Sequence, residues 1–214
     1  IIESRKRKFQ INWKDYEISE PTIPGIQVFD NYPLDELVDY IDWSPFFHAW
    51  EMKGTYPKII NDVRYGDEAR KVLDDGKKLL DDIISDKGIT ARAVIGIFPA
   101  VSNNESVFTE SFEFNFPRQL IDKGKDSYQY SLADFIAPKD DFIGLFAVTT
   151  GHGLEKFVEK YESENDDYNA IMVKILADRL VEALAERMHE RVRKEFWAYA
   201  DHEVLKNEEL FKEK

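Results

Sequence analysis

The strongest constraint on the fold is a stretch from Asp166 to Trp197 that contains neither Gly nor Pro. Its apolar residues recur mainly at every fourth position, which is the spacing of one face of an α-helix. They are Tyr168, Met172, Leu176, Leu180, Leu184, Met188, Val192 and Phe196, flanked by Ile171, Ile175, Val181 and Ala185. At about 1.5 Å per residue this helix is roughly 45 Å long, so we predict that it lies across a core and packs against a sheet. Asp166 or Asp167 is expected to cap its first turn.

Two carboxylates, Asp178 and Glu182, stand four positions apart near the middle of this helix and therefore project from one face. Such a pair is either solvated, with ion pairs to neighbours such as Arg179 and Lys174, or recruited to a ligand. The local sequence by itself favours the ion-paired surface.

Composition limits the classes of protein that this chain can belong to. With 214 residues, 43% hydrophobic and 14% aromatic, it forms one large domain or two small ones with a real core. The net charge of 29 − 42 = −13 disfavours nucleic acid or an anionic membrane as a partner. No apolar run approaches the length of a membrane span, and the start shows no signal peptide and no initiator Met, as in an excised piece of a longer protein. The absence of Cys excludes disulfides and is compatible with a cytoplasmic location.

Helix and strand signals alternate along the chain, after an extended arm at residues 1–24. Expected strands are 25–29, 93–98 (ended by Pro99), 112–116 and 142–148, and expected helices are 33–41, 66–84 and 154–161, with a buried aromatic segment at 43–50. This order indicates an α+β protein with a mixed or antiparallel sheet.

Generic catalytic and metal-binding motifs are weak. His189-Glu190 has Arg193 where a zinc helix would place its second His, so no metal site is predicted. Gly151-His152-Gly153 could hold an anion, but a plain turn between strand and helix is favoured. The basic residues 5–8 are most simply a solvated arm, and those at 191–194 complement the helix dipole.

Several longer motifs are more distinctive than these short patterns. They are Tyr40-Ile41-Asp42-Trp43-Ser44-Pro45-Phe46-Phe47, Gly96-Ile97-Phe98-Pro99-Ala100, Leu132-Ala133-Asp134-Phe135-Ile136-Ala137-Pro138, Asp141-Phe142-Ile143-Gly144-Leu145-Phe146-Ala147-Val148, Asp166-Asp167-Tyr168-Asn169-Ala170-Ile171-Met172-Val173-Lys174 and His189-Glu190-Arg191-Val192-Arg193. Together these motifs resemble one known family, the activation domain of cobalamin-dependent methionine synthase. The resemblance follows the family order from about Trp13 to the C-terminus, and several motifs are six or more residues long.

The resemblance implies a C-shaped α+β fold with a twisted antiparallel sheet, flanking helices and one long C-terminal helix, over residues 25–214. It also implies a cytoplasmic methyltransferase of methionine biosynthesis, in which this domain does not turn over alone. The domain would bind S-adenosylmethionine and cap the module that holds cobalamin. Flavodoxin or a flavoprotein reductase would supply the electron that, with the methyl group, restores methylcobalamin from cob(II)alamin.

The site residues implied by the resemblance are acidic. Asp42 matches a ligand contact of the family, Glu182 matches another acidic position in the cleft, and Asp178 matches its neighbour one turn earlier. Asp42 and Glu182 are therefore expected on one concave face. Carboxylates suit a ligand that carries a sulfonium and an ammonium group. No catalytic residue is assigned, because the chemistry belongs to the cofactor.

One family motif is not in the sequence. Arg-Pro-Ala-Pro-Gly-Tyr is expected shortly after Asn207-Glu208-Glu209-Leu210, and its Arg would pair with the ligand carboxylate. The site is therefore expected to be incomplete in this fragment, with little S-adenosylmethionine binding. The alternative function is a capping or interaction domain for the cobalamin module that has lost the ligand site.

Overall fold

The computed structural model describes residues 2–121, 124 and 127–204, which form two compact units. We call residues 2–26, 95–145 and 192–203 the sheet unit, and residues 27–94, 146–191 and 204 the helical unit. The predicted mixture of helices with a sheet is confirmed. The segment 207–210, after which the family motif was expected, lies outside the described residues.

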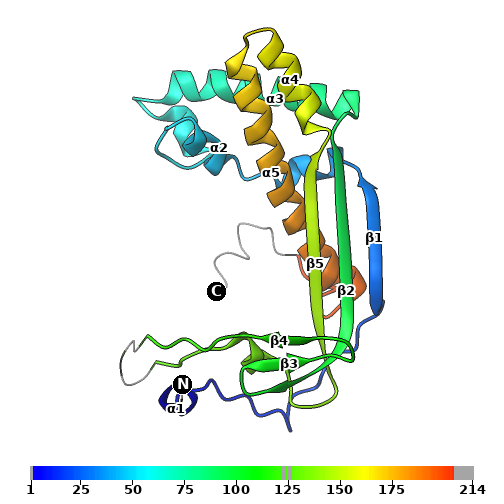
Figure 1. The fold of residues 1–214 in the computed structure, drawn as a ribbon. Helices are drawn as coiled ribbons and strands as arrows, with labels where there is room; N and C mark the ends of the chain where they lie inside the picture. Colours follow the sequence, from blue (N-terminus) through cyan, green and yellow to red (C-terminus); the bar gives the residue numbers. More distant parts are fainter. Residues whose placement is uncertain (1, 122–123, 125–126, 205–214) are drawn as a thin grey trace. The chain divides into compact units, whose positions relative to one another are not determined.

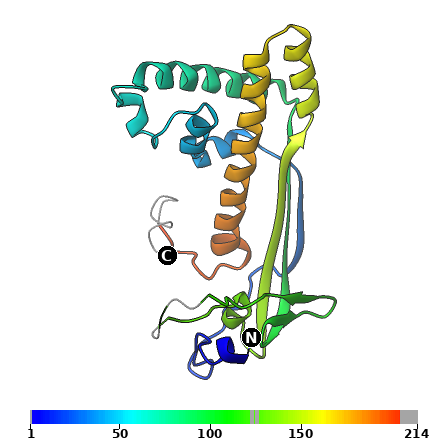
Figure 2. The ribbon, with the colours of Figure 1, turned by 60° about the vertical axis from the view of Figure 1, so that its left-hand side comes forward.

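Helices dominate the helical unit. They are η1 (Asp35–Tyr40, 3-10), α2 (Trp43–Ala49), η2 (Lys58–Asn61, 3-10), α3 (Gly66–Asp86), α4 (Leu154–Ser163) and α5 (Asp167–Arg191). Helices α3, α4 and α5 meet near the start of α5 in both views (Figures 1 and 2). The helix predicted over 66–84 corresponds to α3, while the one predicted over 33–41 is a shorter 3-10 helix.

The apolar face of α5 forms the centre of this unit. Met172, Leu176, Leu180 and Leu184 are each 0% exposed, as the fourfold spacing predicts. Their helix packs against α2, α3, α4 and η1, and the Thr150 hydroxyl of the neighbouring strand donates to the Ala177 carbonyl oxygen (2.8 Å). Asp166 supplies the predicted cap, accepting from the Asn169 N–H at 3.0 Å.

Close packing explains the glycine inside α3. A Cβ at Gly76 would lie 2.8 Å from the Phe46 Cζ atom and 3.5 Å from the Met172 sulfur. Helix α3 therefore approaches the Phe46 ring of α2 so closely that any larger residue at position 76 would require this ring to shift. The prediction that the aromatic segment is buried also holds, with Phe46 and Phe47 both 0% exposed.

Five strands pair around β2. They are β1 (Gly25–Tyr32), β2 (Thr90–Asn103), β3 (Ser106–Phe108), β4 (Glu113–Asn115) and β5 (Asp141–His152). The order is β1-β2-β3-β4, with β5 also paired to β2. Val101 faces Phe108 in the antiparallel β2–β3 pair, and Val107 faces Phe114 in the antiparallel β3–β4 pair. Figure 1 shows β5 running opposite to β2.

Two predicted element ends lie five or more residues away from those in the structure. Strand β2 continues through Pro99 to Asn103, because a proline removes only one backbone donor and its fixed φ suits an extended chain. The α-helix predicted to reach Trp197 ends at Arg191 and is followed by a π-helical turn, η4 (Val192–Phe196). There the N–H of Trp197 donates to the Val192 carbonyl at 2.8 Å, and Ala198 adopts a positive φ of 62°, which ends the helix.

The sheet unit has its own small core. Ala100, Val107, Ala133 and Ile143 are buried, with partly buried aromatic and aliphatic side chains around them. The unit also contains the short helix α1 (Ile2–Arg5) and the 3-10 helix η3 (Leu132–Phe135), so residues 2–10 are not simply an extended arm.

Candidate functional site

Asp42 is the N-cap of α2, with extended backbone angles and an exposed side chain. Its Oδ1 atom accepts from the Ser44 N–H at 2.8 Å, which orients the carboxylate. In the described part of the chain, Oδ2 has no hydrogen-bond partner, so it is available to a cationic group of a ligand.

Asp178 and Glu182 are both exposed on α5, but their surroundings differ. Asp178 pairs with Arg179, whereas Lys174 pairs with Glu162 on α4. The ion-paired surface considered from sequence is thus present at Asp178. Within the described ranges, Glu182 has no ion pair.

All three predicted carboxylates belong to the helical unit, and the helices that carry them, α2 and α5, pack against each other. Among residues 2–121 and 127–204, no hydrogen bond or ion pair joins Asp42 to Asp178 or Glu182. Their location on one concave face stays a prediction.

A polar network that sequence reasoning missed joins β1 and η1 to α5. Arg187 of α5 donates through Nε to the Tyr32 hydroxyl (3.2 Å) and through Nη1 to Tyr40 (3.4 Å) and Glu190 (3.0 Å). Its Nη2 lies 3.6 Å from a Glu36 carboxylate oxygen. The hydroxyl of Tyr40 donates to Glu190, and that of Tyr32 donates to Glu36.

This network borders a cavity of about 310 Å³. Its lining residues are Phe29, Asp30, Asn31, Tyr32, Pro33, Glu36, Arg187 and Arg191. Burial and the hydrogen bond to Glu190 raise the pKa of Tyr40 to about 12, so the phenol remains a donor. Burial acts to lower the pKa of Arg187, but its bonds to Tyr32 and its acidic neighbour keep that pKa above the ordinary value. Only the spacing of Arg187 and Glu190 on one helix face could have signalled this network.

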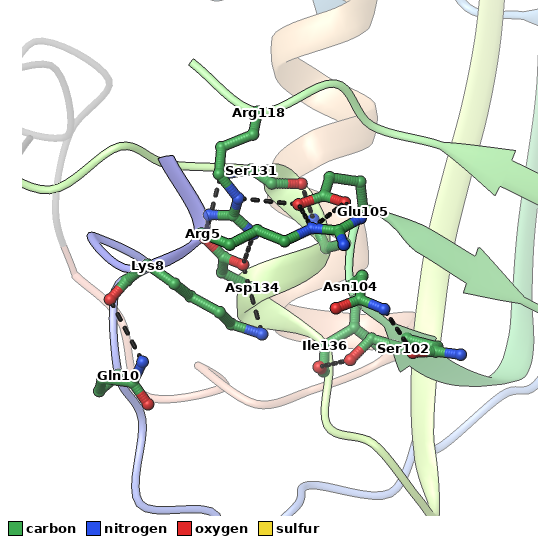
Figure 3. A network of polar contacts seen from close by, with 12 residues as sticks. Arg5, Lys8, Gln10, Ser102, Asn104, Glu105, Arg118, Ser131, Asp134 and Ile136 are labelled. Atoms are coloured by element: carbon green, nitrogen blue, oxygen red, sulfur yellow. Dashed lines mark hydrogen bonds and ion pairs between the residues drawn. The ribbon is translucent and has the colours of Figure 1, made fainter. Parts of the chain in front are cut away.

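A second network, in the sheet unit, is built around the buried Arg118 (Figure 3). Both terminal nitrogens of Arg118 donate to Asp134 at 2.6 Å, and its Nε donates to Glu105 at 2.9 Å. Arg5 donates to the same Glu105, and the Lys8 ammonium lies 3.4 Å from Asp134. Arg5 and Lys8 are therefore ion-paired residues, contrary to the predicted solvated arm.

Aromatic contacts beside this network also hold the N-terminal residues against the rest of the sheet unit. The ring of Phe9 lies 5.1 Å from that of Tyr128 and 5.7 Å from those of Tyr130 and Phe135.

At the other end of the chain, Arg193 is only 6% exposed and pairs with Glu203, so it is not an exposed basic residue.

Comparison with known proteins decides the family. The family model described as "Vitamin B12 dependent methionine synthase, activation domain" matches residues 33–214. The chain belongs to this family. A crystal structure of the MetH reactivation domain bound to AdoHcy is similar to the whole of this chain and to 69% of that chain, with 39% identity and a TM-score of 0.93. The resemblance inferred from the motifs is confirmed, and the domain is part of a methyltransferase, methionine synthase.

Two further features, a membrane-spanning helix and a metal-ligand cluster, are absent from the described residues. None of their helices has the length and apolar character needed to cross a membrane. The same residues contain no group of three or more metal-ligating side chains that could hold an ion.

Proposed function

We propose that this activation domain binds S-adenosylmethionine and supports reductive methylation of cob(II)alamin held by a cobalamin module of the same enzyme. The observation that carries the proposal is the structural match, at 39% identity, to a reactivation domain that binds AdoHcy. In the proposed reaction, the methyl group and one electron from flavodoxin or a flavoprotein reductase convert cob(II)alamin to methylcobalamin, leaving S-adenosylhomocysteine.

The chemistry of the donor set fits this ligand. When bound, S-adenosylmethionine supplies a methyl group attached to a cationic sulfur. Asp42 offers its Oδ2 atom, and Glu182 offers an exposed carboxylate, toward the sulfonium and ammonium groups. Asp178 shares its carboxylate with Arg179, so we assign it a weaker electrostatic role. These residues bind and orient the ligand, and none of them transfers a proton.

Calorimetric titration of the full-length gene product with S-adenosylmethionine and S-adenosylhomocysteine tests the proposal. We expect Asp42→Asn and Glu182→Gln each to weaken S-adenosylmethionine binding by roughly tenfold, or about 1.4 kcal/mol. The variant that lacks the carboxylate facing the sulfonium should lose less affinity for S-adenosylhomocysteine than for S-adenosylmethionine, because S-adenosylhomocysteine lacks the positive sulfur.

Glu162→Gln is the matched control, since it removes an exposed carboxylate that pairs only with Lys174 among the described residues. Its affinities should equal those of the wild type. If the wild-type protein binds neither ligand, the domain is instead a capping or interaction domain without a ligand site. If it binds both but the Asp42 and Glu182 variants bind as tightly as the wild type, the assignment of these two residues to the ligand site is wrong.

A further inference from the structure

We propose that Arg187 is a positioning residue for the ligand site, because it fixes the segment that carries Asp42 against α5. The inference rests on the proposed function and adds a residue that does not touch the ligand. Arg187 lies five positions after Glu182, about 7.5 Å further along the helix axis. It is therefore placed to fix the segment that carries Asp42 relative to the part of α5 that carries Glu182.

The first step is the number of groups that one guanidinium joins. Arg187 contacts Tyr32 at the end of β1, Glu36 and Tyr40 on η1, and Glu190 on its own helix. Its Cζ atom also lies 5.7 Å from the centre of the Tyr40 ring. Because Arg187 is 24% exposed and Glu190 is 18% exposed, the ion pair between them is partly shielded from water and holds more firmly than a surface ion pair, whereas Glu36 is 46% exposed.

The second step is the short path from this network to Asp42. Tyr40 is the last residue of η1, Ile41 is its C-cap, and Asp42 is the N-cap of α2. Ile41 and Trp43 on either side of Asp42 are each 8% exposed. Because only Ile41 separates Tyr40 from Asp42, the bonds that hold Tyr40 against α5 also restrain the backbone at Asp42.

The third step is the requirement for arginine. A guanidinium has a rigid planar fork of five N–H donors, whereas an ammonium is a compact charge with three donors. Lysine at position 187 would keep the charge but could not reach Tyr32, Tyr40 and Glu36 together. The conservative variant therefore separates a geometric role from a purely electrostatic one.

The experiment is a double-mutant cycle on ligand affinity in the full-length gene product. Arg187→Lys and Tyr40→Phe are each made in the wild type, in Asp42→Asn and in Glu182→Gln, and titrated with S-adenosylmethionine. We expect each single change to weaken binding by roughly tenfold in the wild type and much less in the Asp42→Asn background. In the Glu182→Gln background the losses should instead be nearly additive.

Thermal unfolding of every variant, with titrations well below the transition, separates positioning from loss of fold. Lys174→Gln is the control on the same helix, because its ion pair with Glu162 is about half exposed. Additive losses in the Asp42→Asn background, or unchanged affinity in Arg187→Lys and Tyr40→Phe, would overturn the inference while leaving the proposed function intact. Absence of binding by the wild type would instead contradict the proposed function itself.

Discussion

Leu176 illustrates how one residue of the long helix supports the core. Its side chain is 0% exposed, so Leu176→Ala removes buried methyl groups and leaves a cavity. We expect the free energy of unfolding to fall by about 2–5 kcal/mol. Denaturant unfolding measures the change, and Ile171→Ala on the same helix, where Ile171 is 47% exposed, should cost much less. A loss below about 1 kcal/mol at Leu176 would show that this face does not pack as described.

Glu105 makes the stability of the sheet unit depend on pH. The hydrogen bond from Arg5, with that from Arg118, lowers the pKa of the Glu105 carboxyl from 4.5 to about 2. Because the folded state favours the ionised form, this contribution is fully present above the unfolded pKa and is lost as the pH falls from about 4.5 to 2. Bonds from Arg118 likewise outweigh burial and lower the pKa of Asp134.

We therefore expect Glu105→Gln to be less stable than the wild type near neutral pH and to lose less stability on acidification. Urea unfolding at a series of pH values between about 5 and 2 measures how steeply the free energy of unfolding falls with pH in the wild type and in the variant. Glu110→Gln, which removes an exposed carboxylate five positions further along the chain, is the control. Parallel slopes for the Glu105 variant and the wild type would show that Arg5 and Arg118 do not stabilise the ionised form.

At the scale of the elements, the turn from β5 into α4 depends on one of its two glycines. Gly153 has a φ of 92°, and a Cβ there would lie 1.9 Å from the Gly88 carbonyl oxygen. Gly151 has no such angle, and its nearest contact would be 4.0 Å away. We expect Gly153→Ala to cost at least about 2 kcal/mol of unfolding free energy, and Gly151→Ala less than about 1 kcal/mol. Equal midpoints in chemical unfolding would contradict this assignment.

Periodicity predicted the elements whose burial repeats along the chain. It gave α3 and α5, because each helix buries one face. It also placed β5, but the predicted burial of that strand is wrong, since only Asp141, Ile143 and Thr150 of its residues are buried. It did not predict η4, since the bonds of Trp197 and Ala198 to the Val192 carbonyl involve no Gly or Pro signal. The continuation of β2 beyond Pro99 depends on its pairing with β3, which is equally invisible in the local sequence.

For the molecule as a whole, contacts between distant residues set the limit of sequence reasoning. Tyr40 and Glu190 are 150 positions apart, and Arg5 and Glu105 are 100 apart. Propensity and spacing carry no information on such pairs, so the Arg187 network and the attachment of the basic N-terminal residues were missed. The carboxylates Asp42 and Glu182 were proposed only because longer motifs matched a family, and their role awaits the titrations.

The division into two units has a consequence for how this domain can be inherited. Residues of the sheet unit alternate along the chain with those of the helical unit, and strands β2 and β5 contribute to both. No single cut in the gene would release either unit with all of its strands. Recombination within the domain would therefore yield chains with incomplete sheets, so we expect that evolution has duplicated, fused or lost this domain only as an undivided block.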